Sequence, residues 1–252
     1  VGCSDDGHER VDADGSSPVR AVAAATARLE KDSGRIRMRM TSPAFGTVTV
    51  EGVFDGADSR LSPVSFTPPS GSGDPVTGDG AGGETIVVDG RQYTHVSSGS
   101  RAGKAWVSSP LPDRLGASLS PSGIARMLGS IAGVSEAGAA QVDGASTTRY
   151  EGTVSLADFT AATGSTWSAG PEGAGSPEDV ARRKRLDAMA GAAMEIRVQL
   201  WVDRTGRVRK VEVETSKLPA SLVDCGYLSV FREFVGGMHQ VIEFTELGSP
   251  VH

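Results

Sequence analysis

Side chains that could carry out catalysis are sparse in this sequence and lie far apart. The four histidines are His8, His95, His239 and His252, and no G-x-S-x-G, H-E-x-x-H or C-x-x-C pattern is present. A histidine-based triad would need His95 or His239 beside a serine and a carboxylate, which the sequence neither indicates nor excludes. We therefore expect no catalytic residue, no metal and no cofactor, and we keep a secreted hydrolase as the least favoured alternative.

Two short segments match ligand-binding patterns only in part. Residues 78–83 fit G-x-G-x-x-G, but they follow a proline-rich stretch and precede a predicted strand. A dinucleotide site needs a strand before this pattern and a helix after it, so we interpret the segment as a loop. Residues 12–15 (Asp-Ala-Asp-Gly) resemble the start of a calcium loop but lack its later ligands.

Cys3 carries the clearest chemical signal, because it directly follows Val1 and Gly2. This tripeptide matches the end of a bacterial lipobox, in which the cysteine thiol receives a diacylglycerol and the leader is cleaved just before it. We expect a hydrophobic leader to precede Val1 in the natural chain. The motif predicts lipidation at Cys3 and a position on the outer face of the cytoplasmic membrane.

The segment after Cys3 is acidic and almost free of apolar residues, which is typical of a solvated tether. We therefore predict an anchor and flexible tether over residues 1–16 and a single folded domain over residues 17–252. A Cys3–Cys225 disulfide is the alternative that an oxidising compartment would allow. If Cys3 is lipidated, Cys225 is a lone thiol that packs as a small hydrophobic side chain.

The composition excludes several classes of protein. The chain has 252 residues and a net charge of −6, which argues against nucleic acid as a partner because phosphate binding needs clustered basic residues. No apolar run reaches the ~18 residues of a membrane-spanning helix. We expect a monomer that has a membrane contact through its anchor, with a membrane protein as a further possible partner.

Three helices are predicted from capping signals and helical spacing. Ser17 and Pro18 start the first helix, in which Val19, Val22, Thr26 and Leu29 recur at helical spacing. The second helix covers residues 121–132, and the third begins at Ser176 and continues towards Met194.

Most of the remaining chain alternates with a period of two, which is typical of strands with one dry and one wet face. The predicted strands are residues 35–40, 47–54, 60–66, 85–88, 92–96, 104–107, 147–154, 195–202, 208–214, 227–235 and 239–246. Residues 68–83 and 159–175 are rich in glycine, serine and proline and are predicted to be loops. The order of elements indicates an α+β fold, an antiparallel sheet of roughly ten strands with about three helices on one face.

The alternating strands place apolar side chains in rows. These side chains are Met38, Met40, Val48 and Val50 in the first half of the chain, and Val198, Leu200 and Val202 in the second. The simplest interpretation is a core covered by the helices. Because those helices are rich in alanine and glycine, part of the face could instead stay unfilled and form an apolar binding site.

The order of elements also resembles that of a known group of proteins. An anchored tether, a first helix and the strands 35–40 and 47–54 are followed by Val142-Asp143-Gly144 and the strand 147–154. A helix and the hairpin at residues 198–208 complete the pattern. From Val19 onwards, this arrangement resembles the LolA-like superfamily, in particular the LppX/LprG group of actinobacterial lipoproteins.

The resemblance implies a curved half-barrel with helices on the concave face and an apolar cavity between them. It further implies binding, and possible transfer, of an apolar or acylated lipid, with Met38, Met40, Val48, Val50, Val198, Leu200 and Val202 lining the cavity. The alternative is a sensor or protein-interaction module on the same fold, whose concave face is filled by its own side chains.

Overall fold

The structure is a computed structural model of the chain. It describes residues 17–43, 46–69, 76–77, 84–89, 91–95, 106–110, 120–163, 196–216 and 237–249. Within these ranges there are three helices and twelve strands. The helices are α1 (Pro18–Leu29), α3 (Pro121–Gly129) and α4 (Leu156–Thr163). The strands are β1 (Ser33–Ser42), β2 (Gly46–Asp55), β3 (Asp58–Thr67), β4 (Val76–Thr77), β5 (Thr85–Val88), β6 (Arg91–His95), β7 (Trp106–Pro110), β8 (Ala132–Val142), β9 (Ala145–Val154), β10 (Ile196–Asp203), β11 (Val208–Thr215) and β12 (Met238–Thr245).

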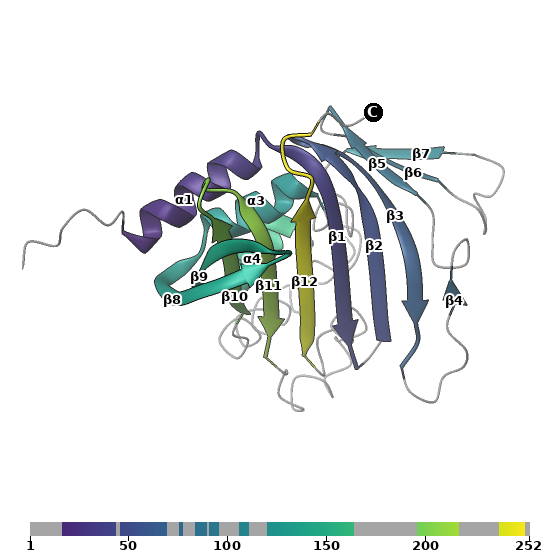
Figure 1. Cartoon of the computed structure of the whole chain (residues 1–252). Helices are drawn as coiled ribbons and strands as arrows, with labels where there is room; N and C mark the ends of the chain where they lie inside the picture. Colours follow the sequence, from purple (N-terminus) through teal and green to yellow (C-terminus); the bar gives the residue numbers. More distant parts are fainter. Residues whose placement is uncertain are drawn as a thin grey trace, which may run out of the picture.

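All twelve strands belong to one antiparallel sheet that curves but does not close (Figure 1). The strand order is β7-β6-β5-β3-β2-β1-β12-β11-β10-β9-β8, and β4 pairs with β3. The C-terminal strand β12 therefore lies in the middle of the sheet, between β1 and β11. This insertion joins the N-terminal hairpins to the hairpins of the second half in one sheet.

The three helices lie on one face of the sheet, which we call the inner face. The helix α1 packs against α3, and α3 packs against α4. Ser17 caps α1 and Ser120 caps α3, each by accepting a hydrogen bond from a backbone N–H in the first turn. Val22 and Leu29 of α1 are buried as their spacing predicts, whereas Val19 is 59% exposed.

The outer face is charged, as the alternation in the sequence requires. In β1 the arginines 35, 37 and 39 are exposed, while Ile36 and Met38 between them are buried. Arg37 pairs with Glu51 on β2 at 3.2 Å, and Arg35 pairs with Glu246 at 3.0 Å. Exposed ion pairs of this kind contribute little stability, but they keep the outer face soluble.

The predicted α+β class and antiparallel sheet are confirmed, but three elements were not predicted. The strand β8 consists mostly of alanine, glycine and serine, which carry no strand signal. The helix α4 occupies the start of a segment expected to be a loop, and β4 lies within the other expected loop. The predicted helix over residues 176–194 and the predicted strand over 227–235 lie outside the described residues.

Candidate functional site

The strand register brings the predicted binding residues onto the same face of the sheet. Met38 of β1 is paired with Ile242 of β12. Ile242 is in turn paired with Val211 of β11, and Val211 with Leu200 of β10. Two residues further along β1, a second row crosses the sheet. It consists of Val48, Met40, Gln240, Val213 and Val198. Residues separated by about 160 positions in the sequence thus share two cross-strand rows.

These residues differ in how deeply they are buried. Val198 and Leu200 are completely buried, and Met38, Val50 and Val202 are also within the core. Met40 and Val48 are only partly buried, although both pack against the core. The row through Met38 is therefore buried throughout, whereas the row through Met40 runs from a closed part under the helices to a more open part on β1 and β2.

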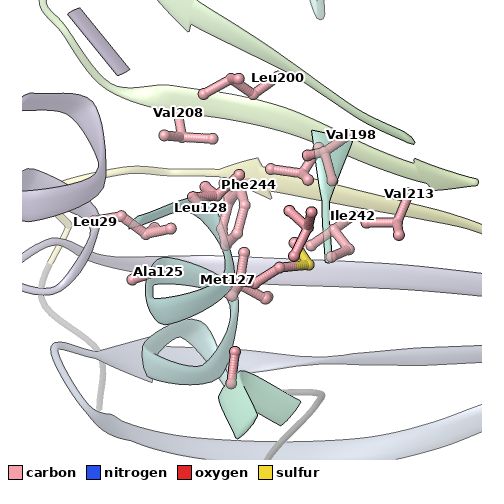
Figure 2. Packing of buried hydrophobic residues seen from close by; sticks show 14 of the residues in the cluster. Leu29, Ala125, Met127, Leu128, Val198, Leu200, Val208, Val213, Ile242 and Phe244 are labelled. Carbon is pink, nitrogen blue, oxygen red and sulfur yellow. The ribbon is translucent and has the colours of Figure 1, made fainter. Parts of the chain in front are cut away.

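The closed part is filled by side chains from the helices. Ile124, Met127 and Leu128 of α3 are at most 3% exposed, and Leu29 of α1 joins the same cluster. Figure 2 shows side chains from both helices and from the strands meeting in this cluster. Phe244 adds an edge-to-face contact with Phe54, with 5.7 Å between the ring centroids.

The open part of the face lies where β1, β2 and β3 are paired. Val48 faces Met40 on one side and Phe66 on the other, and all three side chains are of intermediate exposure. They continue one row of the inner face, and they are less buried than its members Val213 and Val198.

Gln240 is a polar residue of this face that the sequence analysis did not single out. It occupies an inner position of β12 between Met40 and Val213 and is only 6% exposed. Its side-chain Nε2 lies 2.8 Å from the Met38 Sδ. The available signal was its position among Met238, Ile242 and Phe244, which alternate along the same strand.

Asp203 forms a second polar centre, at the turn between β10 and β11. Its carboxylate accepts hydrogen bonds from the N–H and hydroxyl of Thr205 and from the Arg207 N–H, and it pairs with Arg209 at 2.7 Å. Burial raises the pKa of this carboxyl group, but the hydrogen bonds outweigh that effect and lower the pKa to about 2. The arrangement closes a hairpin and leaves the carboxylate no capacity for acid–base work near neutral pH.

Two of the four histidines, His95 and His239, lie within the described residues. The His95 ring makes an edge contact with Trp106, with 5.2 Å between centroids. The His239 ring is exposed on the outer face, 4.0 Å from a Glu212 oxygen. The described part of the chain also holds no group of residues that could bind a metal ion.

Several predicted features fall on residues that the structure does not describe. They are Cys3 and the tether over residues 1–16, Cys225, His8, His252 and the glycine-rich run 78–83. Among the described helices, none combines the length and apolar character that a membrane crossing requires.

Comparison with known proteins gives no match at the level of sequence, either to a protein-family model or to a curated protein. Solved structures do match over most of the chain. The crystal structure of LprF from Mycobacterium bovis aligns with 93% of this chain and 94% of its own, at 13% identity and a TM-score of 0.48. The Mycobacterium tuberculosis lipoprotein LppX aligns with 93% of this chain and 97% of its own, at 11% identity and a TM-score of 0.47.

A LolA superfamily protein from Nitrosomonas europaea aligns with 94% of this chain and 96% of its own, at 9% identity and a TM-score of 0.33. The chain is similar in structure to LolA superfamily proteins and to LprF and LppX. This is the resemblance that the sequence motifs predict. It concerns architecture, and the site must be argued from the residues of this chain.

Proposed function

We propose that this protein is a lipid-anchored extracytoplasmic lipoprotein that holds an apolar, acylated ligand non-covalently on the inner face of its sheet. The supporting observation is the more open end of the row through Met40, where Met40, Val48 and Phe66 are only partly buried. Each ligand methylene buried there contributes about 0.8 kcal/mol, so one or two acyl chains suffice for stable binding.

The closed end of the rows determines how far a chain can penetrate. Val198 and Leu200 are fully buried in the core cluster to which α1 and α3 both contribute, so a ligand reaches them only when these helices move off the sheet. The proposed ligand therefore enters at Met40 and Val48, and movement of the helices extends the site towards Leu200 and Val202. Closure of the helices over the emptied site would then accompany release or transfer.

The proposed anchor is a diacylglycerol on Cys3, with residues 4–16 as a tether to the folded domain that begins near Ser17. A chain attached in this way stays at the outer face of the cytoplasmic membrane as a monomer, where acylated lipids are the abundant apolar ligands. Its anchor and its ligand site are then separate, because the anchor lies outside the domain.

A pair of variants on β1 tests the ligand site. Met40→Asp introduces a charge on the inner face, whereas Thr41→Asp introduces the same charge at the next position, which is exposed on the outer face. We expect Met40→Asp to reduce co-purifying lipid at least tenfold and Thr41→Asp to leave it unchanged, because burying a carboxylate among acyl chains is costly. Circular dichroism confirms that both are folded, and equal lipid in both would contradict the site.

The second candidate function is a protein-interaction module with a closed core. It is favoured by the complete burial of Val198 and Leu200 under side chains of the chain itself. This candidate predicts that the wild-type chain carries no lipid and that Met40→Asp affects only stability. The same measurement therefore separates the two functions.

A further inference from the structure

Gln240 lies at the boundary between the closed and the open part of the inner face. Its cross-strand partners are Val213, which is fully buried, and Met40, which is partly buried. The next residues in the row are Val198 and Val48. An amide group thus sits in the centre of an apolar row, at the depth where a ligand entering over Met40 would meet the packed core.

The protein gives this amide very little hydrogen bonding. Within the described part of the chain, the contact between Nε2 and the Met38 Sδ is the one hydrogen bond of the side chain. A thioether sulfur is a weak acceptor, and a primary amide offers two N–H groups and a carbonyl oxygen. Because Gln240 is only 6% exposed and has this one weak hydrogen bond, an apolar residue of similar size should stabilise the empty protein at least as well.

We infer that Gln240 hydrogen-bonds the polar linkage of the bound lipid and selects neutral acyl esters. This inference rests on the proposed function and names the ligand class for the same site. The Nε2 group donates to an ester carbonyl, and the amide oxygen accepts from a free hydroxyl. An acylglycerol offers both groups next to its chains, whereas a hydrocarbon or an alkyl ether lacks the carbonyl.

The described neighbours of Gln240 in its row disfavour a charged linkage at this depth. Its four neighbours in the row, Val48, Met40, Val213 and Val198, are all uncharged and apolar. A phosphate or carboxylate placed among them would lose its hydration without gaining a cation. A ligand of this site therefore keeps any charged headgroup outside the row and places a neutral ester beside the amide.

A competition between two matched lipids tests this selectivity. The probes are 1,2-dipalmitoylglycerol and its ether analogue 1,2-di-O-hexadecylglycerol, supplied in equal amounts in phosphatidylcholine vesicles. Native mass spectrometry of the recovered protein gives the ratio of bound ester to bound ether. We expect the wild type to favour the ester by about five- to tenfold, the effect of one buried hydrogen bond.

The variant Gln240→Met removes the amide while keeping side-chain volume, and we expect it to bind both lipids with a ratio near one. Gln240→Leu serves as a second variant should the first fold poorly. His239→Met, at an exposed position of the same strand, should keep the wild-type ratio. Thermal unfolding of the empty Gln240→Met protein should show equal or higher stability, which a purely structural glutamine would not allow.

The possible failures are distinct. If the wild type binds both lipids equally, or if Gln240→Met keeps the preference for the ester, the proposed role of Gln240 is contradicted but lipid binding is not. If the wild type takes up neither lipid, both the proposed function and the proposed selectivity are contradicted.

Discussion

At the scale of single residues, Asp203 organises the turn between β10 and β11. Its carboxylate ties the backbone of the β10–β11 turn to Arg209, and its side chain is only 6% exposed. The turn lies directly after the strand that carries Val198, Leu200 and Val202. A defect at Asp203 would therefore loosen the end of the strand that forms the floor of the proposed site.

The low pKa of Asp203 makes its contribution dependent on pH. Because the folded pKa of about 2 lies below the ordinary value of 3.8, the stabilisation is fully present above about pH 4 and disappears as the pH falls through 2. The difference corresponds to about 2 kcal/mol. Urea unfolding between pH 7 and pH 2 should show that Asp203→Asn loses this part of the pH dependence.

The matched control for this prediction is Asp143→Asn, in the exposed turn between β8 and β9. Asparagine tolerates the positive φ of that position, so stability at pH 7 should change by less than about 0.5 kcal/mol. An Asp203→Asn protein with the pH profile of the wild type would show that the turn does not depend on the charged carboxylate.

Gly52 lies where β2 and β3 pair too closely to leave room for a side chain. A Cβ at this position would lie 2.1 Å from the Arg60 carbonyl oxygen and 2.8 Å from a Leu61 methyl group. Gly52→Ala should therefore lower the free energy of unfolding by about 1–3 kcal/mol through backbone displacement. Gly129→Ala, at the end of α3 with open space around it, should be neutral or stabilising, and thermal unfolding of both variants measures the contrast.

At the scale of elements, α1 is tied to the second half of the sheet by its last turn. The Arg28 Nη1 donates to the Thr205 carbonyl at 2.6 Å, and Asp32 pairs with both Arg28 and Arg207, at 3.9 and 3.5 Å. These contacts connect the helix, the β10–β11 turn and the chain just after the helix. They hold α1 in place over Val208 and the adjoining core.

Removing the contacts of the Arg28 side chain should make the last turn of α1 unfold locally more often. We expect Arg28→Ala to speed amide hydrogen exchange in the last turn of α1 by about three- to fivefold, a small effect because Arg28 is 43% exposed. Arg20→Ala, exposed on the same helix, should leave exchange there unchanged. Equal protection in the two variants would mean that apolar packing alone holds the helix.

The local sequence pattern was sufficient to predict the elements with strong hydrophobic periodicity. The alternation of arginine with Ile36, Met38 and Met40 placed β1 and its inner face correctly, and Ser17-Pro18 marked the start of α1. It was insufficient for β8, whose alanines and glycines adopt a strand only because β9 pairs with them. The helix α4 was missed although Ser155 and Asp158 form a capping pair at its start, because eight residues are too few to show a clear helical period.

The candidate site was predictable in part for the same reason. Alternation shows which side chains of one strand share a face, but not which strands become neighbours. The position of β12 between β1 and β11 aligns Met38 with Leu200, and this pairing follows from the topology alone. Gln240 gained significance only once its neighbours in the row were known.

At the scale of the whole molecule, the sheet has two unlike faces. The outer face carries most of the charged side chains of β1 and β11, while the inner face from Phe66 to Val198 is apolar apart from Gln240. Among the described residues, this face is fully buried at Val198 and Val213 and only partly buried at Met40, Val48 and Phe66. In the proposed function, the partly buried end is the part that exchanges an apolar ligand.

The most direct test of the account is native mass spectrometry of the chain with Cys3→Ser, which removes the proposed lipidation site without altering the described domain. The sample is purified from a bacterial host, and its bound material is then extracted with organic solvent. We expect discrete added masses that extract as neutral acyl lipids. A mass equal to that of the polypeptide alone, persisting after incubation with vesicles of phosphatidylcholine and dipalmitoylglycerol, would contradict it and favour the protein-interaction module.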